Sequence, residues 1–572
     1  MGSYGQFWRF GHVHKKTPAK WPYRLYLQGF STGETGGART RDHKLKRLVL
    51  YQLSYRPMLR NTGRLLRHSP TPHKQKPFFL TQLRGKICAQ NINCANAEVA
   101  AERVSVYHTA RMTRLYPNDT IAAIATAPGA GAIAIVRVSG PDAFAIADRL
   151  FRCPAPPPSQ RAAGTFVHGQ VVLPDTGEVA DDALLLVFRA PYSYTGEDAV
   201  ELQGHGGTLP ARRILQAVLA CGARQAEPGE FTKRAFLNDK LDLTQAEAVL
   251  DLIAARSDRA ARLATAQLDN ALGRTLRKIS DSVLAAAADV EAMLDFPDDE
   301  LPQSVPTEIC CQLDAIMAQI SALLATWHEG HLVREGARVV IAGAPNVGKS
   351  TLLNLLTGRE RAIVTPHPGT TRDTIEETLV LQGIPIHLTD TAGLRNAPEQ
   401  IEQEGIRRTH AALEQADLCI YLVDASQPLQ KGDADFLASR SPHKTMILGN
   451  KIDLGQQIHV QNVQNHEYLA VSLKNEPKID EIQAKMVKKI VPDPVLGDST
   501  HVAISTRHQK LLHNAQEYVT NAKEALKTGS EADYLPAANL LRDALEEIGQ
   551  ILGENCPPDV LEAIFSRFCV GK

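Results

Sequence analysis

Hydrophobic and polar residues alternate differently in successive parts of the chain. Residues 119–138 predict two short strands around a Pro-Gly turn, and residues 183–189 predict a further strand. Residues 191–207 combine turn-forming residues with three acidic residues and a histidine. Residues 209–235 predict a helix that is followed by a break at Pro228 and Gly229. Together these segments indicate a compact α+β unit from about 112 to 238.

A helical pattern then takes over. Apolar residues recur at i, i+3 and i+4 over residues 243–294, which predicts long amphipathic helix, and residues 296–300 break it. A second helical run extends to about Glu335, and packing in a bundle is the simplest interpretation of both. From Gly336 strands and helices alternate, which favours a parallel sheet. After about Pro494 the chain is helical again, so the order predicts an α/β domain inserted into a helical domain.

The composition is that of a folded chain, with 44% hydrophobic and 22% charged residues and a mean hydropathy of −0.20. No run approaches the ~18–20 apolar residues of a membrane span, so we expect no integral membrane protein. The nine cysteines are too sparse for a disulfide scaffold, and none forms the C-x-x-C pair of a zinc site. We therefore expect a reduced intracellular protein in the cytoplasm.

The net charge of zero hides a split along the chain. Residues 1–111 hold 20 Lys+Arg and 4 Asp+Glu, whereas residues 112–572 hold 43 and 59, a net charge of −16. Three interpretations of the basic extension compete: a nucleic-acid arm, a transit peptide, or translated sequence upstream of the functional protein. We favour the third, with function starting at Met112. Under the transit-peptide alternative the protein would be mitochondrial.

A phosphate-binding loop follows a buried type of strand at residues 338–342. The pattern G-x-x-x-x-G-K-S runs from Gly343 to Ser350 and leads into a helix, which is the context that this motif requires. Its glycines let backbone N–H groups surround phosphates at the N-terminus of a helix. Lys349 is expected to reach the β- and γ-phosphates, and the Ser350 hydroxyl to ligate Mg²⁺.

Four further motifs follow in the order typical of a GTPase domain. They supply a switch threonine, a carboxylate at a strand end for Mg²⁺, a base-recognition motif and a loop that supports the base. In that order they are Thr370-Thr371, Asp390-Thr391-Ala392-Gly393, Asn450-Lys451-Ile452-Asp453 and Ser472-Leu473-Lys474. The Asp453 carboxylate accepts from two donors on the edge of guanine, and adenine does not offer that pattern. The sequence therefore predicts GTP rather than ATP.

The residues expected to promote hydrolysis depart from the common switch. Leu394 follows Gly393, and a leucine cannot orient a water molecule. Glu402, on the next predicted helix, is a candidate acid, with an ordinary solvated carboxylate as the alternative. Asn346 offers an oxygen beside the phosphates, where a monovalent cation would take over the charge stabilisation of a missing arginine.

Motifs throughout residues 112–572 resemble those of the MnmE/TrmE family of tRNA-modification GTPases. Besides the GTPase motifs they are Asp119-Thr-Ile121, Ile135-Val-Arg137-Val-Ser-Gly140, Thr195-Gly-Glu-Asp198, Glu201-Leu-Gln-Gly-His-Gly-Gly207, Pro228-Gly-Glu-Phe231, Phe236-Leu-Asn-Asp-Lys240-Leu-Asp-Leu243, Gly369-Thr-Thr-Arg-Asp373 and Phe568-Cys-Val-Gly-Lys572. The resemblance covers nearly all of that span, and the basic extension has no counterpart in the family.

The resemblance implies a multidomain protein of class α/β and α. After the extension at 1–111, an α+β domain at 112–238 would bind folate and form the dimer. A helical bundle domain would lie in two parts, 239–335 and 495–572. A P-loop GTPase domain, a parallel or mixed sheet flanked by helices, would be inserted at 336–494.

The resemblance also implies a reaction. A homodimer would form a heterotetramer with the FAD-binding MnmG/GidA protein, and FAD would belong only to that partner. Together they would install a carboxymethylaminomethyl or aminomethyl group at C5 of the wobble uridine of certain tRNAs. The carbon would come from 5,10-methylenetetrahydrofolate, with a 5-formyltetrahydrofolate-like folate as the other form bound. No membrane is implied.

The expected site residues form several sets. The GTP contacts are Asn346, Val347, Gly348, Lys349, Ser350, Thr351, Thr365, Pro366, His367, Pro368, Gly369, Thr370, Thr371, Asp390, Thr391, Ala392, Gly393, Asn450, Lys451, Asp453, Ser472, Leu473 and Lys474. By motif match, Ser350 and Thr371 would ligate Mg²⁺, and Asn346, Thr365, His367 and Thr370 would hold K⁺. Folate would be contacted by Arg137, Glu201, Lys240 and Lys572. Glu402 would act in hydrolysis, and Cys569 in the modification chemistry.

Cys569 is the fourth residue from the end, where we expect a flexible, exposed thiol whose thiolate is the nucleophile. Two other classes of function compete with the enzyme. A regulatory RNA- or ribosome-assembly GTPase would need neither folate nor Cys569. A membrane-surface GTPase is disfavoured, because residues 112–572 carry no basic amphipathic helix or lipidation motif. The net acidity of these residues favours tRNA held largely by the partner or by a local patch.

Overall fold

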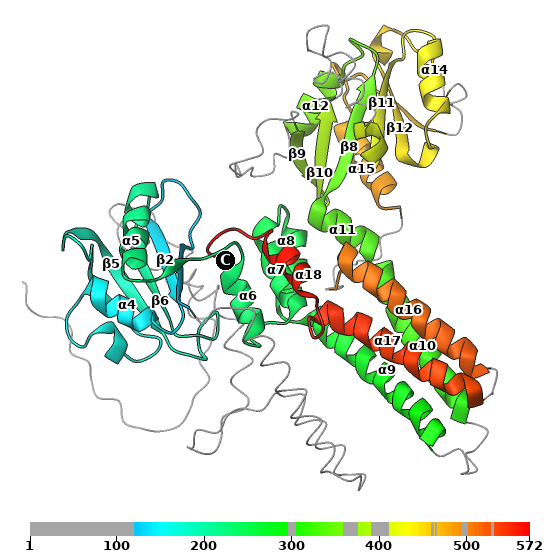
Figure 1. The fold of residues 1–572 in the computed structure, drawn as a ribbon. Coiled ribbons are helices and arrows are strands. Elements are labelled where there is room, and N and C mark those ends of the chain that lie inside the picture. The colour runs from blue at the N-terminus through cyan, green and yellow to red at the C-terminus, as the bar shows by residue number, and fades with distance from the viewer. Residues whose placement is uncertain are drawn as a thin grey trace, which may run out of the picture. The chain divides into compact units, whose positions relative to one another are not determined.

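The computed structural model describes residues 119–295, 305–358, 376–390, 411–458, 463, 466–492, 502–527 and 531–572. The described chain forms a first sheet with its helices, a helical group and a second sheet with its helices (Figure 1). The helical group comes in two parts, one before and one after the second sheet.

The first group is built on a seven-stranded sheet with the order β3-β4-β5-β6-β2-β1-β7. Neighbouring strands are antiparallel except β1 and β7, which are parallel. The strands are β1 (Ile121–Ile124), β2 (Ile133–Ser139), β3 (Phe151–Arg152), β4 (Phe166–Val172), β5 (Val179–Phe188), β6 (Ala199–His205) and β7 (Arg224–Gln225). Successive side chains of a strand point to opposite faces. Ala122 of β1 accordingly packs with α4 (Ala143–Leu150) and α5 (Thr208–Ala220), whereas Ile121 and Ala123 pack with Phe231 of α6 (Glu230–Leu237).

The strands expected within 119–138 and at 183–189 are present, but the assignment of 191–207 to turn-forming sequence is incomplete. Residues 199–205 form β6, which lies between β2 and β5 in the middle of the sheet. Val200 and Leu202 alternate into the core, and Glu201 between them is also buried. Val200, Glu201, Leu202 and Gln203 do alternate as in a strand, but turn-forming residues on both sides of them obscured the element in the sequence.

The single long helix expected over 243–294 is wrong, because the segment forms three helices: α7 (Leu243–Ala254), α8 (Asp258–Leu268) and α9 (Ala271–Asp295). A capping box at Asp242 starts α7. The Ser257 side chain accepts from the backbone N–H of Ala260 and so starts α8. Asn270 adopts a φ of 63°, which no α-helix continues, between α8 and α9.

Two distant parts of the sequence build one helical bundle. Helix α9 packs with α10 (Val305–Ala325), and both pack with helices that follow the second sheet, α16 (Thr506–Lys527) and α17 (Tyr534–Leu552). Figure 1 shows the four helices side by side. Shorter helices, α11 (Trp327–Glu335) and α18 (Pro558–Phe565), complete this group. The predicted insertion of an α/β domain into a helical domain is thereby confirmed.

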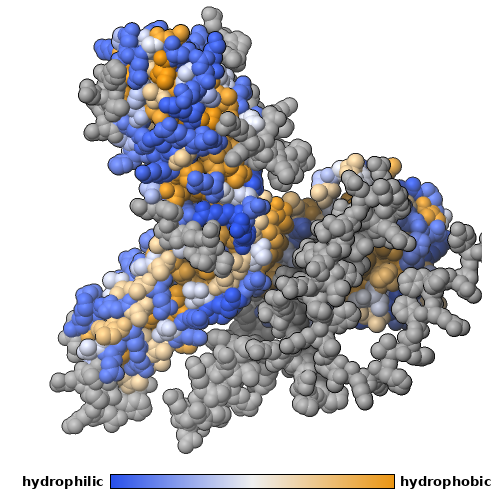
Figure 2. Space-filling view, turned by 180° about the vertical axis from the view of Figure 1, so that it is seen from behind, coloured by the Kyte–Doolittle hydropathy of each residue, from blue (hydrophilic) through white to orange (hydrophobic). Residues whose placement is uncertain are grey.

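Residues 306–335 correct the expectation that no run is long and apolar enough to span a membrane. Among the described residues, 306–335 is helical, long enough and apolar enough to cross a membrane by length and composition alone. Its apolar face contributes Ile309, Leu313, Ile316 and Ile320 to the bundle core. The visible face of the bundle carries hydrophilic residues among hydrophobic ones (Figure 2). We therefore interpret the stretch as a core helix.

The inserted group is a six-stranded sheet with the order β13-β12-β11-β8-β10-β9. All pairs are parallel except β9 with β10. Its elements are β8 (Ala337–Gly343), α12 (Lys349–Thr357), β9 (Glu376–Leu381), β10 (Ile384–Asp390), β11 (Leu418–Asp424), α14 (Lys431–Ala438), β12 (Thr445–Asn450), β13 (Glu467–Ala470) and α15 (Ile479–Ile490). In a parallel sheet the strands' carboxyl ends meet at one edge, where ligands of open α/β folds bind. Every described GTPase motif follows such a strand end.

Candidate functional site

The phosphate loop joins β8 to α12, as the motif requires. Gly348 is the last residue before α12 and has a φ of 109°. A Cβ atom on Gly348 would lie 2.5 Å from Nδ2 of Asn450, so only glycine fits there. The Lys349 ammonium group donates to the backbone oxygens of Gly343 (3.1 Å) and Ala344 (2.7 Å). The lysine is thus folded onto the loop that its motif assigns to phosphate.

The remaining loop residues lie around this lysine. Val347 is buried in the core of the sheet, whereas Asn346, Ser350 and Thr351 are exposed. Asn346 has a φ of 61°, a left-handed conformation that asparagine tolerates better than most residues. The hydroxyls of Ser350 and Thr351 belong to the first turn of α12, where a helix favours negative charge.

Asn450 connects the phosphate loop to the loop expected to support the base. Its Nδ2 donates to the Val347 backbone oxygen (2.8 Å), and its Oδ1 accepts from the Leu473 backbone N–H (3.0 Å). The asparagine is only 6% exposed. Both bonds are therefore shielded from water, and they hold two sequence-distant loops in a fixed relation.

The base-recognition residues contact the loop that Asn450 holds through Leu473. Asp453 accepts a hydrogen bond from the Ser472 hydroxyl (2.6 Å), which orients its carboxylate. Lys451 pairs with Asp424 (2.8 Å), and Lys474 lies in the loop after β13. Burial alone would raise the pKa of Asp424, but hydrogen bonds from Lys451 and Ser426 outweigh it and lower the pKa. Asp424 was missed in the sequence, although its position at the end of an apolar strand was the available signal.

Of the switch motif Asp390-Thr391-Ala392-Gly393, the structure describes the first residue. Asp390 is the last residue of β10 and pairs with Ile341 of β8, next to the phosphate loop, as predicted. The other predicted switch and hydrolysis residues lie outside the described part of the chain: Thr365, Pro366, His367, Pro368, Gly369, Thr370, Thr371, Thr391, Ala392, Gly393, Leu394 and Glu402.

A second cluster of charged residues occupies the face of the first sheet that α6 covers. Arg137 of β2 and Glu201 of β6 are directly opposite each other, and Nε of the arginine lies 3.0 Å from the carboxylate. The guanidinium carbon of Arg137 is 5.2 Å from the centre of the Tyr194 ring and 5.5 Å from that of Phe231. Tyr194 and Phe231 were given no role from the sequence. Burial raises the pKa of Tyr194, whose hydroxyl pairs with Thr232.

The C-terminal tail reaches the same cluster. Burial and the charge of Arg137 lower the pKa of Lys572, while the charges of Cys569 and Glu201 oppose this shift. Phe231, whose ring lies under Arg137, also donates its backbone N–H to the Lys572 backbone oxygen (3.2 Å), so three of the four predicted folate contacts, Lys572, Arg137 and Glu201, belong to one region. The fourth, Lys240, donates to the Pro191 backbone oxygen (2.9 Å), and burial lowers its pKa.

Cys569 is exposed, as expected, but the tail backbone is not free. The backbone N–H groups of Gly229 and Phe231 donate to the backbone oxygens of Cys569 (3.5 Å) and Lys572 (3.2 Å). Pro228 and Val570 form an antiparallel bridge. The tail backbone is thus held by the turn at Pro228 and Gly229 and by the start of α6, contacts that the sequence did not indicate.

Comparisons with known proteins agree with this architecture. The model of the MnmE helical domain matches residues 243–569, and that of the GTP-binding protein TrmE N-terminus matches residues 120–240. The tRNA modification GTPase MnmE of Geobacter sulfurreducens is 41% identical over 460 residues, which cover 80% of this chain and 100% of that protein. The protein of the same name from Chloroflexus aurantiacus is 43% identical with the same coverage.

Among solved structures, the G domain of the T. maritima FeoB iron transporter is 27% identical, covering 27% of this chain and 98% of its own, with a TM-score of 0.22. The family assignment depends on the matched models and the relatives named above. The helical model spans more than half of the chain, and the relatives align over their full length. The chain belongs to the MnmE family of tRNA modification GTPases.

Proposed function

We propose that the chain hydrolyses GTP as part of tRNA modification. The observation that supports this best is the pair of bonds that Asn450 makes to Val347 and Leu473. These bonds place a phosphate loop and a guanine-type base motif on one binding edge, as a guanine nucleotide requires. The relatives named tRNA modification GTPase supply the process in which the hydrolysis is used.

Metal ions complete the proposed nucleotide site. Ser350 and Thr371 would ligate Mg²⁺, and Asn346, Thr365, His367 and Thr370 would hold K⁺. Ser350 fits this role because its hydroxyl is exposed on the first turn of α12 next to Lys349, and hydroxyl oxygen is a ligand that Mg²⁺ accepts. When bound, the cations neutralise charge on the phosphates. Lys349 binds the phosphates, Asp453 selects guanine, and Glu402 acts on the attacking water.

We further propose that the Arg137 cluster binds a folate. A pterin offers N–H donors, a flat ring and, through its glutamate tail, carboxylates. Glu201 is a buried acceptor, Tyr194 and Phe231 are aromatic surfaces, and Arg137 and Lys572 are cations. These groups suit 5,10-methylenetetrahydrofolate or a 5-formyltetrahydrofolate-like ligand. Because Cys569 belongs to the same tail, its thiol is available to chemistry at this site.

The full reaction then needs a partner. As a homodimer, the chain would join an FAD-binding MnmG/GidA-type protein in a heterotetramer and add a carboxymethylaminomethyl or aminomethyl group to C5 of the wobble uridine of certain tRNAs. This would take place in the cytoplasm, or in mitochondria if residues 1–111 are a transit peptide. An assembly GTPase, the alternative, has no use for folate. Calorimetry with 5-formyltetrahydrofolate separates the two, because only the modification enzyme should bind it.

A further inference from the structure

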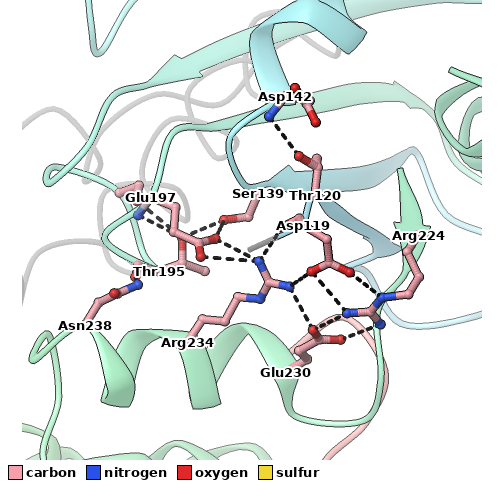
Figure 3. Close-up of polar contacts among 11 residues, drawn as sticks. Asp119, Thr120, Ser139, Asp142, Thr195, Glu197, Arg224, Glu230, Arg234 and Asn238 are labelled. Atoms are coloured by element: carbon pink, nitrogen blue, oxygen red, sulfur yellow. Dashed lines mark hydrogen bonds and ion pairs between the residues drawn. The ribbon is translucent and has the colours of Figure 1, made fainter. Parts of the chain in front are cut away.

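Four side chains at the start of α6 form a cluster of alternating charge, which we call the arginine–carboxylate cluster: Asp119, Arg224, Glu230 and Arg234 (Figure 3). Arg224 lies 2.7 Å from Asp119 and 2.6 Å from Glu230, and Arg234 lies 2.6 Å from Asp119 and 2.9 Å from Glu230. The side chains of Glu230 and Arg234 are each 10% exposed. Burying charges is costly unless they are well paired. We therefore expect the cluster to add little net stability and to act mainly by holding these segments in one arrangement.

Two further bonds connect the cluster to backbone on two sides. Glu230 accepts from the backbone N–H of Glu227 (2.8 Å), which closes the turn that contains Pro228 and Gly229. Arg234 donates to the backbone oxygen of Asp119 (2.8 Å), just before β1 begins. The same four charged groups thus fix both the turn and the beginning of β1.

The C-terminal tail lies between these two segments. The turn donates its Gly229 and Phe231 N–H groups to the tail on one side. On the other side, Gly571 is buried against the end of β1, and a Cβ atom there would lie 2.2 Å from the backbone oxygen of Ile124. Its φ of 96° also favours glycine. The turn and β1, the two segments that contact the tail, are therefore both bonded to the arginine–carboxylate cluster.

We propose that Arg234 and Glu230 are positioning residues for the C-terminal tail. By fixing the turn at 227–231 relative to β1, they place Cys569 and Lys572 beside Arg137 and Glu201. The bonds that receive the tail measure 3.5 and 3.2 Å, so a small displacement of the turn would lose them. The consequence for folate rests on the proposed function, whereas the consequence for the tail does not.

The test uses amide exchange in the full-length chain, followed by mass spectrometry. The variants are Arg234→Met, Glu230→Gln and Gly571→Ala, and Arg213→Met serves as the control because its pair with Glu178 is on the surface of the same domain. We expect exchange in 227–232 and 568–572 to rise at least about 10-fold in the first three variants and to stay unchanged in the control. Exchange in the bundle should stay as in the parent.

A double variant distinguishes positioning from general weakening. In the Gly571→Ala background the tail is already displaced, so adding Glu230→Gln should raise exchange in 568–572 no further, whereas independent effects would add. If Arg234→Met does not fold, Glu230→Gln and the double variant decide the matter. Parent-like exchange in Glu230→Gln, or additive effects in the double variant, would overturn the proposal.

Folate binding gives a separate measurement. With 5-formyltetrahydrofolate as the probe, calorimetry should show a Kd at least about 10-fold weaker in Glu230→Gln than in the parent and unchanged in Arg213→Met. Unchanged folate affinity despite a released tail would overturn the placement of Lys572 at the ligand. If the parent itself binds no folate, the proposed function is wrong. Amide exchange would still test whether Arg234 and Glu230 position the tail.

Discussion

Asn450→Ala is expected to weaken guanine-nucleotide binding strongly without unfolding the protein. The substitution leaves the Val347 backbone oxygen without its donor and the Leu473 N–H without its acceptor, at a site where Asn450 is only 6% exposed. An unsatisfied buried polar group costs about 1–3 kcal/mol, so the two losses together come to about 3 kcal/mol. Because nucleotide binding requires both loops in register, about 3 kcal/mol corresponds to an affinity loss of roughly 100-fold.

Titration of GDP and GTP by calorimetry measures this loss. Asn514→Ala is a matched control, because the Asn514 amide pairs with Glu547 in the bundle. The nucleotide affinity of this variant should equal that of the parent. Asn450→Asp keeps an acceptor for Leu473 but turns a carboxylate toward the Val347 oxygen, so its affinity should also stay well below that of the parent. An Asn450→Ala variant that binds within about 3-fold of the parent would refute the idea that this bridge organises the site.

Four further expectations concern stability, cations, the two chemistries and the extension. Contacts with His508 and Arg507 hold the pKa of Glu247 below its usual value although burial alone would raise it, and burial lowers the pKa of His508. Both shifts make the folded state bind fewer protons than the unfolded chain in acid, so urea unfolding should show stability falling below about pH 6.5 as His508 of the unfolded chain takes up a proton, and further below about 4.5 as Glu247 of the unfolded chain does so, the second part being absent in Glu247→Gln. GTP hydrolysis should be much faster in K⁺ than in Na⁺, and equal rates would indicate an arginine finger instead. Cys569→Ser should abolish wobble modification but leave hydrolysis near normal, while Glu402→Ala should slow hydrolysis without greatly weakening GTP binding, as kcat and Kd measurements will show. A chain starting at Met112 should be fully active in complementation, and native protein should lack peptides from 1–111 in mass spectrometry; an inactive shortened chain, or such peptides at full abundance, would contradict the view that function starts at Met112.

The position of the described nucleotide motifs at strand ends was predictable because these motifs are local. Each described motif occupies a strand end and the few residues after it, so a short stretch of sequence contains both the chemistry and the element that positions it. Gly348 and Asp453 illustrate this: glycine permits the positive φ that the loop requires, and aspartate supplies the carboxylate of the base motif. Asp424 escaped prediction because an acidic residue after a strand is common, and only the pairing with Lys451 reveals its part.

The second site was less predictable because its geometry is formed by distant segments. Glu201 lies on a strand within a segment that was assigned to turn-forming residues, and its partner Arg137 comes from another strand. The tail is held by a turn more than three hundred residues earlier in the chain. The family resemblance supplied Arg137, Glu201 and Lys572 together, but no periodicity or spacing indicated that Gly229 and Phe231 receive the tail. The division of residues 243–294 into three helices also depended on caps that the apolar spacing alone does not show.

We propose that this chain supports folate-dependent modification of tRNA through GTP hydrolysis. The most direct measurement incubates the chain with its FAD-binding partner, GTP, tRNA and 5,10-methylenetetrahydrofolate labelled at the transferred carbon, and then analyses the wobble nucleoside by mass spectrometry. We expect labelled carbon on C5 of the wobble uridine, and no label when GTP is omitted or when Cys569 is replaced by serine. Wobble uridine without label in the complete reaction, from protein that hydrolyses GTP normally, would contradict it.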